Sequence, residues 1–386
     1  MSVSAARELR PVGAVVGGEV LLPDGLVSTD VVVEGHLIGA IGKGDAAADA
    51  VDASGCYVVP GFIDIHFHGC MGADLCDATA GALKTIAEHE ASRGVTAICP
   101  ATMTFPEDLL VRIAEIVHGF RPDAHEAALV GFNLEGPYIS PEKVGAQNPA
   151  YVRPCSTREF TRIQGTSCGM VKLVDIAPEE PEAMSFIETM ADRVRISLAH
   201  TCADYDTARL AFEKGARHLT HLFNAMPGLH HRNPGPIAAA AERDDVTAEL
   251  IADGIHVHPA MVRLAFSLFG GDRIILISDS MRATGLEDGT YDLGGQDVTV
   301  RGPRATLENG ALAGSVTDLA ACVATAVTQM GIPFETAVRA ATINPARAVG
   351  IDDVRGSIEV GKIADMVLLD KETLAVKQVI VRGRAL

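Results

Sequence analysis

The hydrophobic pattern of the chain changes near residue 61. Before that point, short β-branched runs such as VGAVVGGEVLL, STDVVVEGHLIGAIGKG and GCYVVPG alternate with Gly, Pro and Asp, which predicts an all-β segment. From Gly61 onward, apolar runs of strand length alternate with amphipathic stretches of helix length, which is typical of βα units around a parallel sheet. We expect eight such strands, at residues 61–68, 95–103, 127–135, 171–177, 195–201, 218–224, 246–255 and 273–279.

The stretches between these strands carry helix start and stop signals, since several open with Pro or Asp and end near Gly. We expect helices at residues 79–93, 106–118, 181–192, 204–214 and 259–269, and two closing helices at 318–330 and 333–349. Residues 151–169 fit this scheme poorly: they contain only a short helix candidate, and we expect them to be mostly loop. A β excursion is expected at 291–315, before the closing helices.

Eight strands in βα alternation predict an α/β fold, namely a (β/α)8 TIM barrel over residues 61–350. The tail from Gly356, with ADMVLLD and AVKQVIVRG, returns to a β pattern. We therefore expect a small β-sandwich domain that is built from both ends of the chain, residues 1–60 and 351–386.

The sequence GFIDIHFHG at residues 61–69 carries the first candidate site. If the strand runs to its end, His66 and His68 lie on the same face, because side chains alternate along a strand. Two imidazoles at a strand end form half of a site for a divalent metal. The alternative is that they are two polar residues at a strand terminus.

Further residues of metal-binding type follow other predicted strands. They are Glu135 in GFNLEGPY, His200 in ISLAHT, His221 in HLTHLFNAM, His256 in LIADGIHVH and Asp279 in IILISDS. A barrel gathers its active site at these strand ends, and the residue types suit zinc, iron or a similar ion. Singly, each has a simpler interpretation: Asp279 as a helix cap, Glu135 as a turn residue, a histidine as a hydrogen-bonded strand end. Five other histidines are expected to be surface or structural residues: His36, His89, His118, His125 and His218.

Composition narrows the class of protein. Hydrophobic residues make up 48% of the chain and charged residues 21%, which is typical of a globular protein with a large core. The formal charge of -18 argues against nucleic-acid binding, although arginines can still hold a small anionic substrate. The eight cysteines form no CxxC pair and no secretion signal is seen, so we expect free thiols and a cytoplasmic location. No apolar run reaches the ~18–20 residues of a membrane span.

The motifs HFHG after PGFIDI, LEGPY, AHT, THLFNAM and SDS resemble the amidohydrolase superfamily. More narrowly, NLEGPYISP, THLFNAMPGLHHRNPG, IADGIHVHP and ALAGS resemble its family of N-acetylglucosamine-6-phosphate deacetylases over nearly the whole chain. No lysine lies at a predicted strand end, so the carbamylated lysine of dihydroorotases and hydantoinases is not expected. Glu135 takes that place.

The resemblance implies roles for the candidate residues. Glu135, His200 and His221 would hold the principal metal, and Asp279 would be the general base and acid. His256 would contact the substrate and stabilise the oxyanion. His66 and His68 would bind a second ion bridged by Glu135 with help from Asp279, or would hydrogen-bond beside a single-metal site. Zinc is the expected metal, with iron, manganese and cobalt as alternatives.

The resemblance also implies a binding site for a phosphorylated amino sugar. Its expected contacts are Ala146, Gln147, Asn224, Ala225, His231, Arg232, Asp253, Gly254, Ile255, His256, Leu312, Ala313 and Gly314. Arg232 and His231 would hold the phosphate, across the interface of a homodimer. Gln147 departs from family members that carry histidine there, and it cannot carry charge.

The implied reaction is hydrolysis of N-acetylglucosamine 6-phosphate to glucosamine 6-phosphate and acetate, in amino-sugar catabolism and cell-wall recycling. The first alternative is the N-acetylgalactosamine 6-phosphate epimer, because few contacts distinguish the C4 hydroxyl. A cyclic amidohydrolase is a more distant alternative. A non-catalytic scaffold is disfavoured because Glu135, His200, His221 and Asp279 are all present.

Overall fold

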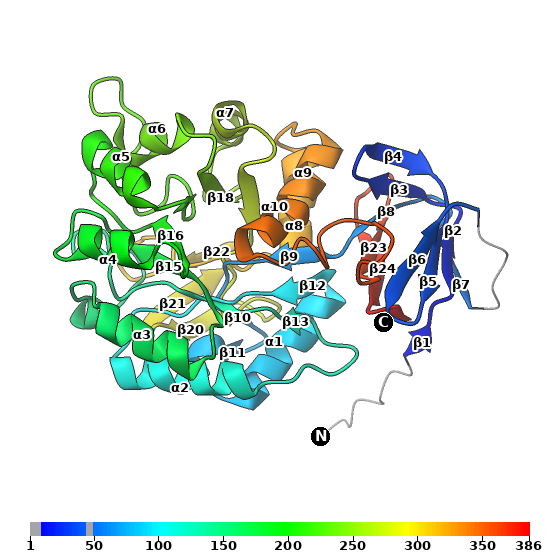
Figure 1. The fold of residues 1–386 in the computed structure, drawn as a ribbon, viewed down its shortest axis with the longest axis horizontal. Helices are drawn as coiled ribbons and strands as arrows, with labels where there is room; N and C mark the ends of the chain where they lie inside the picture. The colour runs from blue at the N-terminus through cyan, green and yellow to red at the C-terminus, as the bar shows by residue number, and fades with distance from the viewer. Residues whose placement is uncertain (1–8, 44–48) are drawn as a thin grey trace.

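The computed structural model describes residues 9–43 and 49–386 of the chain, and the molecule is elongated (Figure 1). One end is formed by β-strands from both ends of the chain, drawn in blue and red. The other end contains the remaining strands and the helices, and it holds the candidate site. No helix among the described residues is long and apolar enough to cross a membrane.

Segments from both termini share one seven-stranded sheet in the order β1-β25-β24-β23-β8-β3-β4. Its strands are β1 (Arg10–Pro11), β25 (Arg384–Ala385), β24 (Val376–Val381), β23 (Met366–Asp370), β8 (Cys56–Pro60), β3 (Glu19–Leu22) and β4 (Gly25–Ser28). A four-stranded sheet contains β6 (Leu37–Ile41), β5 (Val31–Glu34), β2 (Ala14–Val16) and β7 (Ala50–Asp52) in that order. Alternate residues such as Val31 and Val33 are buried with Val58 and Leu368 in one apolar cluster between the sheets.

The predicted parallel strands occur in two sheets. The three-stranded sheet contains β13 (Ala128–Leu129), β12 (Val95–Ile98) and β9 (Phe62–Asp64). The six-stranded sheet contains β14 (Phe132–Leu134), β15 (Val171–Ile176), β16 (Arg195–Leu198), β17 (His218–Leu219), β18 (Thr247–Ile251) and β19 (Ile274–Ile277). A bridge between Ala101 and Asn133 joins the two sheets. Every predicted strand region therefore contains a parallel strand, and the third region contains two.

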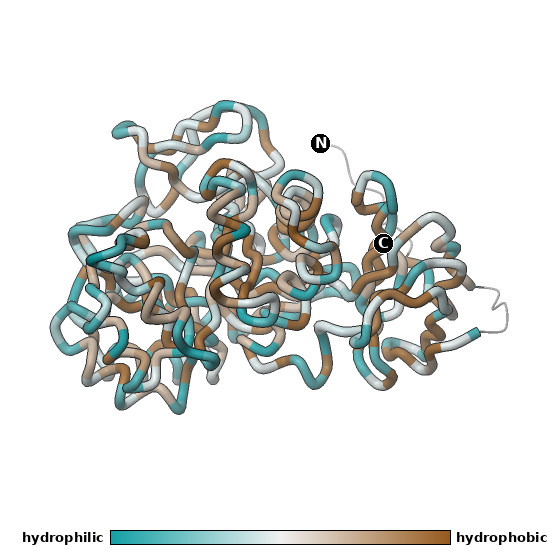
Figure 2. Tube along the Cα trace, turned by 90° about the horizontal axis from the view of Figure 1, so that it is seen from above, coloured by the Kyte–Doolittle hydropathy of each residue, from teal (hydrophilic) through white to brown (hydrophobic). Residues whose placement is uncertain are grey.

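Helices follow the strands and cover the α/β part. They are α1 (Ala80–Ser92), α2 (Glu107–Gly119), α3 (Thr157–Thr166), α4 (Ala183–Met190), α5 (Tyr205–Lys214), α6 (Gly235–Ala241), α7 (Pro259–Phe269), α8 (Leu319–Thr328), α9 (Phe334–Ala340) and α10 (Ile343–Val349). Apolar segments run through the interior and polar ones lie outside (Figure 2). Caps fix several starts: Thr79, Asp204 and Asp318 each accept a hydrogen bond from the third backbone N–H of their helix.

Three local predictions were wrong. Residues 151–169 are not mostly loop, because Ser156 accepts a hydrogen bond from Glu159 N–H and starts helix α3. The single helix expected at 333–349 is divided into α9 and α10. The strand expected at 61–68 ends at Asp64, because the Asp64 carboxylate accepts a hydrogen bond from His66 N–H. His66 and His68 therefore lie on the loop after the strand.

The expected β excursion is a three-stranded sheet of β20 (Gly289–Leu293), β21 (Gln296–Arg301) and β22 (Arg304–Thr306). Its buried residues Leu293, Val298 and Val300 pack with Met103 and Met281 in one apolar cluster. Met281 follows Asp279 by two positions. The excursion is therefore attached directly to the edge of the α/β part where the candidate residues lie.

A short hairpin of β10 (Gly69–Cys70) and β11 (Ala73–Asp74) immediately follows His68. A Cβ on Gly69 would lie 2.0 Å from the Ala73 carbonyl oxygen, so the hairpin requires glycine. We expect Gly69→Ala to destabilise the protein by about 1–3 kcal/mol, the usual cost of overpacking, and to displace His68. Thermal unfolding and metal content measure the two effects.

The matched control is Gly81→Ala, on the exposed face of α1, where a Cβ would have no neighbour within 4 Å. We expect this variant to be as stable as the parent or slightly more stable, because alanine favours a helix. Equal stability of the Gly69→Ala variant and the parent would contradict the close contact.

Candidate metal centre and substrate pocket

The ends of five parallel strands place the predicted ligands in one cluster. Because these strands are parallel, their carboxyl ends meet at one edge. Glu135 directly follows β14, and four residues each come two positions after a strand: His66, His200, His221 and Asp279. Together with His68, all are buried. The structure thus brings together every residue that the sequence predicts as a metal ligand.

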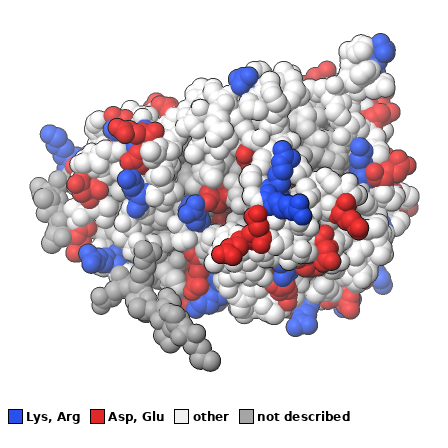
Figure 3. All heavy atoms as spheres, turned by 180° about the vertical axis from the view of Figure 1, so that it is seen from behind, with Lys and Arg blue, Asp and Glu red and all other residues white. Residues whose placement is uncertain are grey.

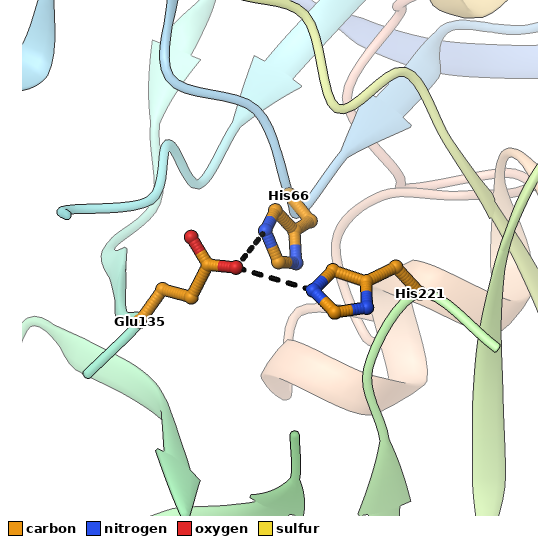
Figure 4. A group of neighbouring side chains, drawn as sticks. All are labelled: His66, Glu135 and His221. Atoms are coloured by element: carbon orange, nitrogen blue, oxygen red, sulfur yellow. Dashed lines mark hydrogen bonds and ion pairs between the residues drawn. The ribbon is translucent and has the colours of Figure 1, made fainter. Parts of the chain in front are cut away.

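Glu135 lies at the centre of this cluster. Its Oε1 is 3.0 Å from His200 Nε2, 3.2 Å from His221 Nε2 and 3.4 Å from His66 Nε2. Figure 4 shows the carboxylate and the rings of His66 and His221 pointing toward one another. The Nε2 atoms of His200 and His221 are themselves 3.2 Å apart. Four polar atoms therefore share one small volume.

His68 and Asp279 lie on the other side of the Glu135 carboxylate. His68 Nε2 is 3.4 Å from both Glu135 Oε2 and Asp279 Oδ1. Asp279 Oδ1 is also 3.9 Å from His66 Nε2. Two groups of ligand atoms result, one of His66, Glu135 and His221 and one of His66, His68 and Asp279, with the atoms of each group within 4.8 Å of one another.

Hydrogen bonds on the far side of three rings show which nitrogen faces the centre as an acceptor. His66 Nδ1 is 2.9 Å from Glu249 Oε2. His68 Nδ1 is 3.3 Å from the Ala101 carbonyl oxygen, and His200 Nδ1 is 2.8 Å from the Lys143 carbonyl oxygen. Carbonyl and carboxylate oxygens only accept, so each Nδ1 carries a hydrogen. A charged ring carries a second hydrogen on Nε2, whereas the neutral ring, which is the form that ligates a metal, directs the Nε2 lone pair inward.

These converging lone pairs fit a metal ion. His66 Nε2 and Glu135 Oε2 are fully buried and have no hydrogen-bond partner among the described residues. Buried acceptors that face one another without a donor are costly, and a cation relieves that cost. Imidazole nitrogens and carboxylate oxygens are donors that zinc and similar divalent ions accept. The residues present therefore fit one divalent ion or a pair.

Glu249 supports the cluster from below and was not among the predicted residues. Its Oε2 accepts from His66 Nδ1–H and, at 3.2 Å, from His221 N–H, while its Oε1 is 3.0 Å from His218 Nε2. Burial alone would raise the pKa of Glu249, but the charge on His66 and the hydrogen bonds from both histidines outweigh it and lower that pKa. A carboxylate within an otherwise buried apolar strand was the available signal.

The backbone at the site is held in an unfavourable conformation. His200, His221 and Asp279 have φ angles of 44°, 26° and 50°, in the left-handed region that such residues rarely adopt. Each such residue costs about 1–3 kcal/mol and persists only where the surrounding structure enforces it. The strand ends thus turn sharply, which directs these side chains toward Glu135.

A cavity of about 410 Å³ opens over the cluster and contains most of the predicted substrate contacts. Its lining includes Ala146, Gln147, Asn224, Ala225, His256, Leu312 and Gly314, together with His68, Glu135, His200, His221 and Asp279. It also includes residues that the sequence prediction omitted: Met103, Glu142, Lys143, Gly145, Phe223, Leu293 and Ala311. Lys143 lies in the loop after LEGPY and supplies a cation beside the pocket.

Six predicted contacts lie elsewhere in this chain. Ala313 is fully buried between the lining residues Leu312 and Gly314, and Asp253 and Ile255 line a neighbouring cavity of about 230 Å³. Gly254 follows Asp253 on the same loop. His231 and Arg232 are exposed on the loop between β17 and α6, where Arg232 Nη1 is 2.7 Å from His231 Nε2.

His256 is held by Asp253. The His256 Nδ1–H donates to Asp253 Oδ2 at 2.7 Å, and Asp253 Oδ1 accepts from the backbone N–H groups of Ile255 and His256. Burial alone would lower the pKa of His256, but the hydrogen bond and charge of Asp253 outweigh it and raise the pKa. Asp253 therefore orients the His256 ring rather than lining the main cavity.

Gln147 has a structural contact that the sequence could not reveal. Thr104 N–H donates to Gln147 Oε1 at 2.6 Å, so the side-chain oxygen is occupied by the backbone. The three-stranded sheet also holds this loop, because Gln296 Nε2 on β21 donates to the Ala146 carbonyl at 2.6 Å. Only the amide nitrogen of Gln147 is left for a substrate oxygen.

We expect Glu249→Leu to weaken metal binding by about 10- to 100-fold, the usual cost of losing an outer-shell partner of a ligating histidine. Leucine fills the space but leaves His66 Nδ1–H without an acceptor. Glu249→Gln keeps one accepting oxygen, so its metal affinity should lie between those of the parent and of the Glu249→Leu variant. Competition with a chelator measures the affinity, and an unchanged affinity in a folded Glu249→Leu variant would refute the support role.

Comparison with known proteins gives one consistent family. The sequence profile of the amidohydrolase family matches residues 57–386. The chain is 39% identical to N-acetylglucosamine-6-phosphate deacetylase of Bacillus subtilis, over 85% of this chain and 82% of that one. It is 37% identical to N-acetylgalactosamine-6-phosphate deacetylase of Escherichia coli, over 84% and 86% of the two chains.

Solved structures agree with the sequence relatives. A variant of N-acetyl-D-glucosamine-6-phosphate deacetylase from Mycobacterium smegmatis, in complex with N-acetyl-D-glucosamine 6-phosphate, superimposes with a TM-score of 0.90. It is 33% identical and covers 97% of this chain and 98% of its own. The similarity thus extends over both the β part and the α/β part.

Proposed function

Because this chain belongs to the amidohydrolase family, we propose that it hydrolyses the acetamide of N-acetyl-D-glucosamine 6-phosphate to D-glucosamine 6-phosphate and acetate. The observation that carries the proposal is the convergence of Glu135, the histidine Nε2 atoms and Asp279 at the floor of a cavity of about 410 Å³. The relatives named above supply the substrate. This reaction belongs to amino-sugar catabolism, and the cytoplasmic location remains a prediction from the sequence.

Glu135, His200 and His221 would hold the principal metal, and His66 and His68 a second ion, with zinc as the expected element. A divalent ion at such a site polarises the amide carbonyl and lowers the pKa of bound water toward neutrality. His66, His68 and His200 are fixed in the tautomer this requires by their Nδ1 hydrogen bonds. We thus propose one or two ions per subunit, and the second ion would be the one beside His66 and His68.

Asp279 would take the proton of the attacking water and return it to the departing nitrogen. Burial alone would raise the pKa of Asp279, but the hydrogen bond from His68 and the charges on His66 and His68 outweigh it and lower that pKa. The group is then a carboxylate at neutral pH, ready to accept a proton. His256, held by Asp253, would donate to the oxygen of the carbonyl under attack. The carbon–nitrogen bond breaks to give acetate and the amine.

The sugar phosphate would lie toward Asn224, Ala225 and Lys143. Arg232 and His231 are exposed and outside the cavity of their own chain. This position supports a homodimer in which the loop at 228–233 reaches the pocket of the partner. On the face drawn in Figure 3, acidic and basic side chains are intermingled rather than forming a basic track, in agreement with a small substrate instead of nucleic acid.

We also propose that the two parallel sheets form one (β/α)8 barrel, over residues 61–350. The bridge between Ala101 and Asn133 supports one junction, and the hydrogen bond from Asp279 N–H to the His66 carbonyl, 3.0 Å long, supports the other. The two terminal sheets around their shared apolar cluster would form the β-sandwich domain, from residues 1–60 and 351–386.

The galacto epimer is the second candidate, because the Escherichia coli relative named for that substrate is nearly as similar. A cyclic amidohydrolase is disfavoured, since Glu135, and not a lysine, directly follows β14 and lies at the centre of the ligand atoms. The scaffold alternative is disfavoured because every predicted ligand is present and they are gathered in one cluster.

We expect the zinc-loaded protein to release acetate from N-acetylglucosamine 6-phosphate with a higher kcat/KM than from the unphosphorylated sugar. The ratio should be about 10- to 100-fold, since a charge-assisted hydrogen bond contributes about 1.5–3 kcal/mol. N-acetylgalactosamine 6-phosphate is the matched control, and faster release from it would assign the galacto reaction. Metal-loaded protein that releases no acetate from either phosphorylated sugar would refute the function.

A mixture of two impaired variants, assayed at a substrate concentration well below the KM of the Arg232→Ala variant, tests the partner contact. Asp279→Asn should lose about 10²- to 10⁴-fold in kcat, the usual contribution of general acid–base catalysis, and Arg232→Ala should raise KM. If Arg232 serves the partner, co-expression forms heterodimers with one intact site, so about one quarter of parental activity should return. Without exchange of Arg232 across the interface, the mixture stays as inactive as its components.

A further inference from the structure

A second group of metal-binding atoms lies outside the substrate cavity. It contains the Cys70 thiol on β10 and, near the end of α1, a ring nitrogen of His89 and a carboxylate oxygen of Glu90. The three ligand atoms lie within 4.8 Å of one another. Cys70 and Glu90 are buried, whereas His89 is partly exposed and gives the group a route to solvent.

The Glu90 carboxylate is buried, and one of its oxygens is not paired with a hydrogen-bond donor or a cation among the described residues. That oxygen, Oε2, is fully buried and has no hydrogen-bond partner in the part of the chain that the structure describes. The nearby Arg93 does not supply this donor, because its Nε and Nη2 donate to Asp318 Oδ2 at 2.8 and 2.6 Å. A buried carboxylate oxygen without a donor or cation is costly.

The charges around Glu90 also disfavour an unpaired carboxylate at this position. Burial raises the pKa of Glu90 well above its usual value, and the negative charges of Asp64 and Asp318 raise it further. The charge of Arg93 and a hydrogen bond with the Cys70 thiol offset only part of this increase. The Cys70 thiol lies beside this carboxylate. A cation at this position would lower the cost of ionising both groups.

We propose that Cys70, His89 and Glu90 form a binding site for a zinc-like divalent ion, separate from the predicted catalytic centre. Thiolate, imidazole and carboxylate are the three donor types of zinc sites, with metal–ligand distances of about 2.0–2.3 Å. Ligand atoms within 4.8 Å of one another need only small side-chain rotations to reach such distances. The thiol proton leaves to solvent when sulfur binds the ion, and a water fills the fourth position.

Such an ion would connect two elements that determine the position of His68. Cys70 lies two residues after His68 in the β10–β11 hairpin, and helix α1 packs against this hairpin. Binding would join the hairpin to the last turn of α1, away from the cavity. The site is therefore expected to stabilise the hairpin rather than to take part in hydrolysis.

Cobalt(II) provides a direct test on the full-length, metal-free, reduced protein. The predicted catalytic ligands are nitrogen and oxygen atoms, so a sulfur-to-cobalt charge-transfer band reports only on cysteine. Cys168 is replaced by Ser in every sample, because its sulfur is 3.8 Å from His118 Nε2 and offers a second cysteine–histidine pair. We expect this background to take up cobalt with a charge-transfer band in the near ultraviolet.

Two further substitutions on that background assign the band. Cys70→Ser should abolish it, and Glu90→Gln, which keeps the size of the side chain, should weaken the affinity by about 10-fold or more. Glu90→Gln decides the matter if Cys70→Ser fails to fold. Absence of the band, or a band unchanged by both substitutions, would overturn the proposal and leave a protonated Glu90 beside a free thiol. The readout does not depend on acetate release, so it is separate from the test of the proposed function.

Discussion

The architecture of the site depends on one electrostatic constraint: buried acceptors meet around Glu135 without enough donors. His66, His68 and His200 each use Nδ1–H in a hydrogen bond on the far side of the ring, so their Nε2 lone pairs face the carboxylate. Lone pairs at 3.0–3.4 Å from a carboxylate oxygen repel it unless a cation or a proton lies between them. The outer hydrogen bonds thus determine what the centre can bind.

The cost of this arrangement is carried by the surrounding α/β part. His200, His221 and Asp279 adopt left-handed backbone conformations, and Glu249 is held as a carboxylate in the interior by two histidines. The strands beneath are fully buried, as in Ile274–Ile277, and the helices pack outside them. A rigid apolar scaffold can hold such strained and polar residues in place, which is the usual relation between stability and function at enzyme sites.

Much of the fold was predictable because its signals are local. Buried apolar runs located every parallel strand, and caps such as Asp204 located helix starts. The ends of strands were less predictable. The turn at His66 depends on a hydrogen bond from its N–H to Asp64, and α3 depends on the Ser156 cap, which the sequence prediction overlooked.

The ligand residues were predictable because each follows a strand, and parallel strands end together. Their supporting residues were not, since such contacts link distant segments. Glu249 meets His66 across 183 positions, and Gln296 fixes Ala146 across 150. His89 was assigned to the surface or to a structural role, and only the packing of α1 on β10 places it near Cys70. Long-range proximity, rather than residue type, separates the predicted part of the site from the rest.

Anomalous X-ray scattering at the zinc absorption edge, from crystals grown with zinc, tests the central claim most directly. We expect a peak about 2.0–2.3 Å from Glu135 and from the Nε2 atoms of His200 and His221, as zinc ligation requires. A second peak beside His66 and His68 would establish the ion pair. A zinc-soaked crystal with no anomalous peak next to Glu135 would contradict the claim that these lone pairs converge to hold a metal.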